Sequence, residues 1–387
     1  MATNTLTMQG ITVPNAVNDP ETFFAKTRRV VFPFVANRSF AGLGNSDNYS
    51  LLKSNIVAGI NLRLVGSVVT VHGTGAVATT ARWPYDLVRV RVAANGQSQL
   101  INAKGWKLRA REMMANELSS DRGVIQSIGG SNVQQGTLSF ASESWGLGQS
   151  ASAITDGTYN FDLELFVPIA YDSKTLLGAL FLQTTSTDLV MTLDWANQSD
   201  LFTLTGTATA TVTCNVQAQA IAFSIPEING QIVVPDLSTF HSIIENRATG
   251  FANGDNEITL VGQGIGRQLC RLFYQTWNGT APQTPLAVND TNYGQAAWRF
   301  GGNDTPENWM TARAARQNME RIFNCDLGGA QGINVWDWAA ESAFRDSIDE
   351  GAATELRFLV NYPSGLTLTN PVCEYVQETV FAGAVGA

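Results

Sequence analysis

Histidine is the first residue to examine for a catalytic or metal site, because its side chain titrates near neutral pH and is a common metal ligand. The chain has 387 residues and two histidines, His72 and His241. Metal sites that need several imidazoles, including those of a two-cupin protein, are therefore nearly excluded, and we predict no metal site. His241 and Glu245 lie four residues apart, on one face of a short helix expected over residues 236–247. We interpret them as a hydrogen-bonded surface pair rather than as metal ligands.

A glycine-rich stretch could in principle hold a phosphate group. Residues 261–266 read Val-Gly-Gln-Gly-Ile-Gly and follow an expected strand. They lack the GxGxxG spacing, the start of a helix and the βαβ unit that a dinucleotide site requires. We therefore interpret this stretch as a bend in a strand and predict no cofactor.

Three carboxylates, Asp194, Asp337 and Glu341, could be imagined as the acid pair of a glycosidase. A glycoside hydrolase of β architecture would need two of them together in a cleft. Nothing in the sequence places any two side by side, so solvated loop acids are the default interpretation. We predict that the protein is not an enzyme.

The charge of the chain argues against nucleic acid as a partner. It has 33 acidic and 24 basic residues, and its formal net charge is −9. A general nucleic-acid binder needs clustered Lys and Arg to neutralise phosphates. We therefore expect no specific binding of nucleic acid.

The cysteines and the N-terminus both bear on where the chain is made. Four cysteines, at positions 214, 270, 325 and 373, are far apart and show no CxxC spacing. Disulfides remain possible in principle, but a reduced protein is favoured. Residues 1–15 lack the basic start and apolar middle of a signal peptide, and no window approaches the ~18 apolar residues of a membrane-spanning helix. We expect synthesis in a cytoplasm.

The most regular pattern in the chain is an alternation of side chains over residues 203–219. Odd positions carry Thr, Asn or Gln, and the even positions between them carry Leu, Gly, Ala, Val or Cys. An alternation with a period of two predicts a β-strand with one solvent-exposed face and one buried face. Because the buried face is mostly Ala, we expect a facing sheet rich in Phe and Trp. Strands of more than ~10 residues are unusual, so we expect a bend near residues 206–209 and the main ladder over residues 210–223.

Further short apolar runs separated by turns predict an all-β protein. Asn-Gly pairs at positions 95, 229, 253 and 278 supply the positive φ angles of tight turns. The other strands are expected at residues 60–71, 87–92, 159–167, 189–194, 258–261, 269–274, 333–338, 356–362 and 372–380.

Helical signals are few. The best covers residues 304–323, where Thr305 can cap the helix, Pro306 suits its first turn and apolar residues follow at helical spacing. A second helix is expected from about Trp106 to residue 118, and a third, shorter one over residues 236–247.

Residues 225–230 mark a boundary, since Pro226 and the pair Asn229-Gly230 would interrupt any strand. Each side of it then holds a run of strands interrupted by one helix that begins with Trp, which hints at architectural duplication. We expect an N-terminal arm at 1–29, a first domain at 30–225, a linker at 226–235 and a second domain with a C-terminal tail at 236–387.

Four stretches carry a resemblance to a known family, in the same order along the chain. They are residues 166–179 with the strand 189–197, residues 235–246, residues 308–326 and, more weakly, residues 104–108. In these stretches the chain resembles the major capsid proteins of tectivirus-like phages with an internal membrane. No active-site signature is among them, so the resemblance rests on order and spacing.

The resemblance implies a double jelly roll, that is, two eight-stranded β-sandwich barrels in one chain with a few short flanking helices. It further implies a homotrimer that forms a pseudo-hexagonal capsomer of an icosahedral virion capsid, over an internal lipid membrane. The partners would be the other copies of the chain, penton and minor capsid proteins. A jelly roll is a self-contained sandwich whose flanks can pack against copies of itself.

Two sets of residues follow as candidates for these contacts. On the helix over residues 304–323, packing of Trp309 on its own barrel is the simpler interpretation. The helix could also lie at the trimer interface, through Trp309, Arg313, Arg316 and Arg321. In the N-terminal arm, aromatic residues next to a basic cluster could contact anionic headgroups, although a solvated arm or a charged strand end would give the same pattern. That membrane-facing set is Phe23, Phe24, Lys26, Arg28 and Arg29.

The sequence leaves a second class of function open. The alternative is a β-sandwich spike protein that binds a receptor or a glycan. Such a protein would carry an exposed aromatic platform and would exist as isolated trimers.

Overall fold

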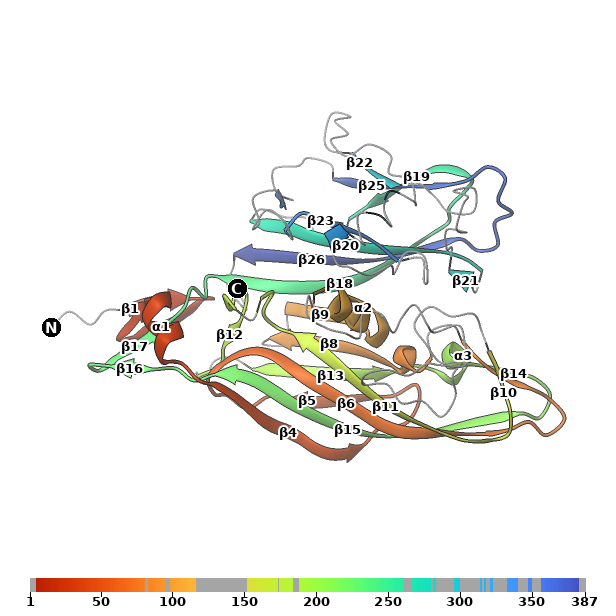
Figure 1. Cartoon of the computed structure of the whole chain (residues 1–387), viewed down its shortest axis with the longest axis horizontal. Coiled ribbons are helices and arrows are strands. Elements are labelled where there is room, and N and C mark those ends of the chain that lie inside the picture. Colours follow the sequence, from red (N-terminus) through yellow and green to blue (C-terminus); the bar gives the residue numbers. More distant parts are fainter. Residues whose placement is uncertain are drawn as a thin grey trace.

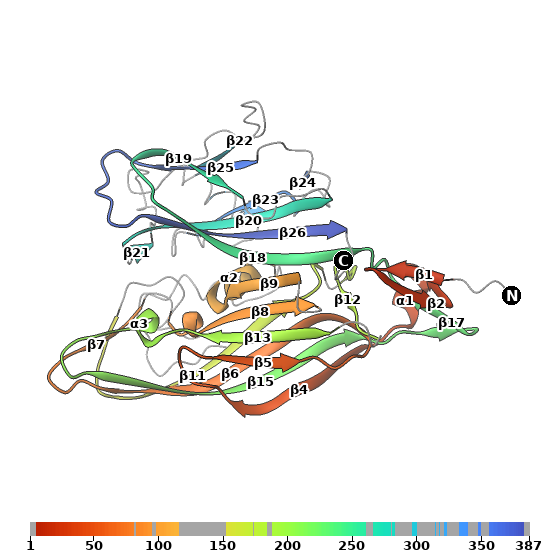
Figure 2. The ribbon, with the colours of Figure 1, turned by 180° about the vertical axis from the view of Figure 1, so that it is seen from behind.

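The computed structural model consists of two β-sandwiches stacked on one another, with helix α2 (Gly105–Ala115) between them and a small lobe at the N-terminal end (Figures 1 and 2). The structure describes residues 5–80, 83–94, 98–115, 152–172, 174–183, 188–260, 266–279, 281–282, 296–299, 314, 317, 321–322, 333–339, 347–349 and 356–382.

The first sandwich consists of two facing sheets whose strands come from distant parts of the sequence. One sheet has the order β4 (Arg29–Ser39), β15 (Thr209–Phe223), β6 (Ile56–Val71) and β11 (Gly157–Pro168). The other has the order β5 (Ser46–Ser50), β13 (Leu189–Trp195), β8 (Val88–Ala94) and β9 (Ser98–Lys104). In chain order these are eight strands arranged 1-8-3-6 and 2-7-4-5, and every pair within each sheet is antiparallel.

Strand β15 confirms the alternation seen in the sequence. Its residues at odd positions from Thr209 to Gln219 are exposed or half-buried, and those at even positions from Ala210 to Ala220 are buried. The expected interruption is also present, because β14 (Phe202–Leu204) ends before a turn in which Gly206 has φ +60°. The expectation of a facing sheet rich in Phe and Trp is wrong. The facing strands present mainly Val, Leu and Met, with Trp195 at the end of β13.

The second sandwich repeats the strand order of the first. One sheet runs β18 (Thr239–Thr249), β26 (Val372–Ala382), β20 (Arg267–Asn278) and β23 (Ile333–Asp337), so its order corresponds to 1-8-3-6. The facing sheet runs β19 (Gly254–Thr259), β25 (Arg357–Tyr362) and β22 (Ala296–Arg299). The architectural duplication expected from the sequence is therefore visible in the topology.

The two sandwiches also share a sheet edge. Strand β9 of the first pairs in parallel with β18 of the second, through Ile101 opposite Ile243 and Asn102 opposite Ile244. A single sheet thus continues from one sandwich into the other (Figure 2).

Strand β18 replaces the third helix predicted from the sequence, which is wrong. The prediction rested on Phe240, Ile243 and Ile244 at helical spacing. Most side chains from Phe240 to Glu245 are buried, on both faces of the strand, because it lies between the two sandwiches. Burial on both faces removes the alternation that would have identified a strand.

The N-terminal lobe is built from the expected N-terminal arm and the expected linker. A hairpin of β1 (Thr5–Met8) and β2 (Ile11–Pro14) and helix α1 (Pro20–Lys26) pack in one apolar cluster with residues 233–237. Strand β3 (Ala16–Asn18) pairs in parallel with β17 (Gln231–Val234), which forms a hairpin with β16 (Glu227–Ile228). The segment expected to be an arm is therefore folded over residues 5–28, against the expected linker.

The remaining elements are short. They are β7 (Val77–Thr79), the 3₁₀ helix η1 (Tyr85–Leu87), β10 (Ser152–Ile154), β12 (Leu180–Phe181), α3 (Gln198–Leu201), β21 (Ala281–Pro282) and β24 (Ile348–Asp349). Helix α2 confirms the helix predicted from Trp106, as far as Ala115. Of the helix predicted over residues 304–323, the described residues Ala314, Gln317, Arg321 and Ile322 are helical, and the rest lie outside the described residues.

Candidate functional site: the ionic seam between the two sandwiches

Helix α2 supplies one side of the contact between the sandwiches. Trp106, Leu108 and Ala110 belong to the core of the first sandwich. Lys107 and Arg111 are one helical turn apart and therefore on the same side of the helix, where they meet the second sandwich. Both are buried, with exposed fractions of 1% and 4%.

Strands β20 and β26 supply the other side through three rungs of their ladder. Arg271 lies opposite Glu378, and Gln275 lies opposite Glu374. Between them, Phe273 lies opposite Val376, and both belong to the core of the first sandwich. The opposite face of the same strands lies in the core of the second sandwich, through Leu272, Tyr274, Cys373 and Tyr375. We call the polar residues of this contact the seam: Lys107, Arg111, His241, Arg271, Gln275, Asp337, Glu374 and Glu378.

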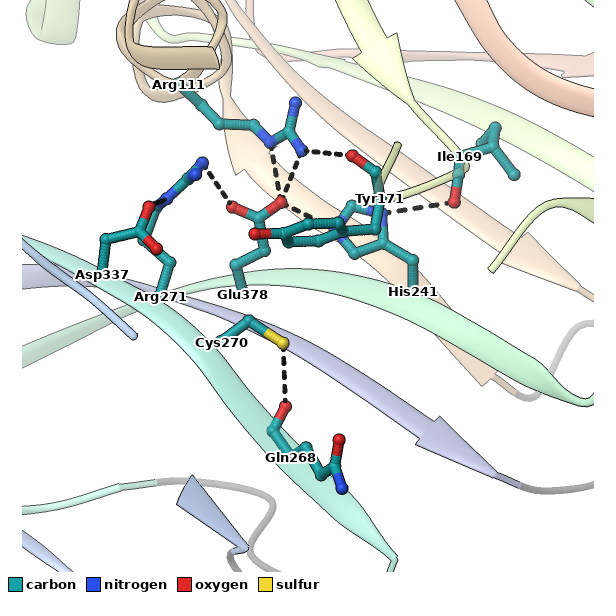
Figure 3. Close-up of polar contacts among 9 residues, drawn as sticks. All are labelled: Arg111, Ile169, Tyr171, His241, Gln268, Cys270, Arg271, Asp337 and Glu378. Atoms are coloured by element: carbon teal, nitrogen blue, oxygen red, sulfur yellow. Dashed lines mark hydrogen bonds and ion pairs between the residues drawn. The ribbon is translucent and has the colours of Figure 1, made fainter. Parts of the chain in front are cut away.

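Glu378 is the centre of the seam and is completely buried (Figure 3). Arg111 donates to its Oε1 atom from Nε at 2.9 Å and from Nη2 at 2.5 Å. Arg271 donates from Nη1 to the Oε2 atom at 3.1 Å and from Nε to Asp337 at 2.5 Å. The carboxylate thus joins α2 of the first sandwich to β20 and β26 of the second.

The electrostatics of the seam follow from this pairing. Burial alone would raise the pKa of Glu378, but Arg111 and Arg271 outweigh it and hold that pKa well below its usual value. The pKa of Arg271 is raised, because Asp337 and Glu378 outweigh the effect of burial. The two carboxylates and two guanidinium groups therefore balance without any charge on His241.

His241 lies between the two sandwiches and is completely buried. Its Nε2 atom lies 2.9 Å from Glu378 Oε1 and its Nδ1 atom 3.2 Å from the carbonyl oxygen of Ile169. Both neighbours are acceptors, which favours the charged ring. Burial outweighs them and lowers the pKa of His241. The predicted surface pair of His241 with Glu245 is wrong, because the strand buries His241 and brings it to Glu378.

Glu245 makes different contacts. Its Oε2 atom accepts a hydrogen bond from the backbone N–H of Lys104 at 2.7 Å and lies 3.4 Å from Arg89. Both partners belong to the first sandwich, so Glu245 ties β18 to that sandwich at the end of β9.

A second polar group occupies the other end of the seam. Lys107 Nζ lies 3.4 Å from Glu374 Oε2 and 3.4 Å from Gln275 Oε1. The same ammonium group lies 4.7 Å from the centre of the Trp106 ring. An amine, a carboxylate and a carboxamide are therefore in contact in a buried site.

Two groups next to the seam, the thiol of Cys270 and the hydroxyl of Tyr171, are strong nucleophiles only when deprotonated. Burial raises the pKa of the neighbouring Cys270 thiol and of the Tyr171 hydroxyl, which keeps both groups protonated. Within the part of the chain that the structure describes, no group of three or more His, Cys, Asp or Glu side chains could hold a metal ion. The ion pairs of the seam can hold the two sandwiches in a fixed orientation relative to each other.

Of the carboxylates considered for glycosidase chemistry, Asp194 and Asp337 lie in different sandwiches. Asp194 is bound by Arg91, with N–O distances of 2.5 and 2.8 Å, on the outside of β13. Asp337 belongs to the seam, and Glu341 lies outside the described residues.

The residues predicted for the trimer interface and the membrane are only partly described. Arg321 is helical and exposed, whereas Trp309, Arg313 and Arg316 lie outside the described residues. Phe23 is completely buried in the N-terminal lobe and is thus unavailable to lipid. The exposed members of the membrane-facing set are Phe24, Lys26, Arg28 and Arg29.

Sequence reasoning missed the seam. The available signal was two glutamates, Glu374 and Glu378, in an otherwise mostly apolar strand, together with Lys107 and Arg111 at helical spacing.

No helix in the described part of the chain is long and apolar enough to cross a membrane.

Comparison with known proteins gives matches at the level of structure. No protein-family model and no curated protein sequence matches the chain. The crystal structure of the MCP of STIV, the Sulfolobus turreted icosahedral virus, matches with a TM-score of 0.62 and 11% identity, over 93% of this chain and 97% of that chain. The major capsid protein P2 of bacteriophage PM2 matches with a TM-score of 0.52 and 10% identity, over 93% of this chain and 100% of that chain. The capsid of the virus PBCV-1 matches with a TM-score of 0.55 and 10% identity, over 92% and 95%. The chain therefore has the double jelly-roll fold found in these viral major capsid proteins.

Proposed function

We propose that the protein is the major capsid protein of a virus and has a structural, non-enzymatic role. The observation that carries this proposal is a likeness to viral major capsid proteins over 93% of the chain, a share too large to come from one sandwich alone. The seam supports it, since it can hold the two sandwiches as one building block.

The proposed building block is a homotrimer. Three copies, each with two sandwiches of the same strand order, would give a ring of six similar barrels and hence a pseudo-hexagonal outline. A closed ring of this kind uses a heterologous contact between copies. Flat assembly of such rings would form the faces of an icosahedral capsid, with penton and minor capsid proteins as further partners.

Light scattering of the purified protein combined with electron microscopy tests this proposal. We expect a mass three times that of the 41.7 kDa chain and hexagonal particles that tile. Lobed trimers that never tile would favour a receptor- or glycan-binding spike. A monomer at all concentrations would contradict both assemblies.

We further propose that the segment predicted to be helical that carries Trp309, Arg313, Arg316 and Arg321 lies at the trimer contact. The exposure of Arg321 is consistent with this role. Reversing the charges of Arg313 and Arg316 to Glu should then weaken the trimer. Lys53→Glu with Lys174→Glu, a double reversal at exposed sites elsewhere, serves as the control. A trimer that remains intact in the Arg313→Glu and Arg316→Glu variant would contradict this proposal.

The N-terminal lobe could contact an internal membrane. Phe24 is 40% exposed on α1 and is close in sequence to Lys26, Arg28 and Arg29, a combination suited to anionic headgroups. Since Phe23 holds α1 in the lobe, point variants are a better test than deletion of the first 29 residues. Phe24→Ser combined with Lys26→Glu, Arg28→Glu and Arg29→Glu should abolish flotation with anionic liposomes. Equal flotation of the variant and the unmodified protein would remove this proposal.

A further inference from the structure

Lys107 differs from every other lysine of the chain. The sequence has five lysines, and Lys26, Lys53, Lys104 and Lys174 are exposed or half-buried. Lys107 alone is buried, with an exposed fraction of 1%. Lysine is almost never fully buried unless it is paired, so this position calls for a specific explanation.

Lys107 contacts a carboxamide and a carboxylate of the second sandwich. Gln275 is completely buried and Glu374 is 6% exposed. They lie directly opposite each other on β20 and β26, so their side chains are neighbours on one face of the sheet. Lys107 Nζ lies 3.4 Å from Gln275 Oε1, the oxygen on the carbon that a nucleophile would attack, and 3.4 Å from Glu374 Oε2.

We propose that Lys107 and Gln275 condense to an isopeptide bond that joins the two sandwiches covalently, with Glu374 as the group that transfers the proton. Glu374 takes a proton from the ammonium group, which frees the lone pair of Nζ. The amine attacks Cδ of Gln275, the Nζ–Cδ bond forms and the Cδ–Nε2 bond breaks. The carboxamide nitrogen leaves as ammonia, and the proton held by Glu374 leaves with it as ammonium. The step is a transamidation without oxidation or reduction, and needs no co-reactant.

The site supplies the two conditions that this step needs. Contact between the reacting groups in a fixed orientation replaces a bimolecular encounter, which lowers the barrier of intramolecular reactions. Burial disfavours ions, and passing the proton from the ammonium group to the carboxylate leaves two neutral groups beside the buried ring of Trp106 and the buried pair Phe273 and Val376 of the same two strands.

Two neighbouring sites in the structure lack one of these components. Arg111 meets Glu378 in the same seam, but a guanidinium group is always charged and is no nucleophile. Lys104 Nζ lies 3.5 Å from the carboxylate of Asp86, and its side chain is 31% exposed to water. Condensation is therefore specific to Lys107.

The mass of the unmodified full chain tests the proposal without any mutation. Denatured protein should be lighter than its sequence mass, with or without Met1, by one ammonia. Trypsin should leave Lys107 uncut, and tandem mass spectrometry should find its peptide joined to the peptide that follows Arg271. A full sequence mass, or a deficit with cleavage after Lys107 and a linear peptide containing Gln275, would overturn the proposal.

Variants assign the roles of the three groups. Lys107→Arg and Gln275→Met each remove one reacting group, and Glu374→Gln removes the proton acceptor. All three should regain the full mass, which can be read on denatured material even when a variant folds poorly. Lys104→Arg is the matched control and should keep the deficit. Retention of the deficit and of the joined peptide in Glu374→Gln would overturn the role of Glu374. Because the readout is a mass, it stands apart from any test of trimer formation.

Discussion

Glu378 and Glu257 each lie between two arginines, but in very different surroundings. Glu378 in the seam binds Arg111 and Arg271 and has a side-chain exposure of 0%. Glu257 on β19 binds Arg357 from the adjacent strand β25 and Arg299 from β22, the strand beyond it, with a side-chain exposure of 36%. Each carboxylate is shared by two arginines, Glu378 also contacts His241, and the largest difference between the two groups is burial.

Burial changes what such a group can do for the protein. In water, charges are screened, and an exposed ion pair contributes little to stability. In the seam each charge is costly without its partner, so the two sandwiches can approach only in the orientation that satisfies all of them. We therefore expect Glu378 to determine how the two sandwiches are oriented. We expect Glu257 to contribute to solubility and little to stability.

Removal of Glu378 should give the largest effect. Glu378→Ala leaves Arg111 and Arg271 buried with fewer partners, which should lower the free energy of unfolding by about 3–5 kcal/mol. Chemical denaturation measures this loss, and calorimetry should show the two sandwiches unfolding separately. A decrease of less than about 1 kcal/mol in the free energy of unfolding would mean that Glu378 contributes no more than an exposed ion pair. Burial would then not explain a difference between Glu378 and Glu257.

Low pH should also destabilise the folded protein through His241 and Glu378 of the seam. The pKa values of His241 and Glu378 are lowered in the folded protein, so the unfolded chain takes up protons first as the pH falls. The free energy of unfolding should therefore fall with decreasing pH, from about pH 6.5 for His241 and from below pH 4.5 for Glu378. Denaturation curves between pH 8 and pH 4 check this. The variant His241→Gln should lose the upper part of the dependence, and a chain that is more stable at pH 5 than at pH 7.5 would contradict the assignment.

A milder change at Arg111 tests the geometry of the pairing. Arg111 donates to Glu378 from two nitrogens and to the carbonyl oxygen of Tyr171 at 3.3 Å. Arg111→Lys keeps the charge but cannot make all of these bonds, so we expect a loss of about 1.5–3 kcal/mol. Thermal and chemical denaturation measure it. Unchanged stability would show that charge alone, without the fork of the guanidinium group, is sufficient in the seam.

The fold was accessible from the sequence because its signals are local. The alternation along β15 and the turns between short apolar runs depend on residues that are neighbours in the chain. Strand β18 was mistaken for a helix because both of its faces are buried, one of them by a sandwich more than a hundred residues away in the sequence.

The seam could not be predicted from the sequence, for a related reason. Lys107 and Arg111 at helical spacing suggest a solvated helix face, and their partners Glu374 and Glu378 lie 267 residues further along the chain. Only the packing of α2 on β20 and β26 brings these charges together. The duplication hinted at by the two helices with Trp could be predicted, but not the fact that one of the helices lies between the sandwiches.

The smallest effect is expected at Glu257, and it decides whether burial is the cause of the difference. Glu257→Ala removes the carboxylate that Arg299 and Arg357 share, but both arginines remain in contact with water, where hydration replaces the lost partner. The free energy of unfolding should fall by about 0–1 kcal/mol, and high salt should make the variant and the unmodified protein equal. A loss as large as that of Glu378→Ala would mean that two arginines around one carboxylate are sufficient by themselves. The seam would then owe its strength to its composition and not to its position between the sandwiches.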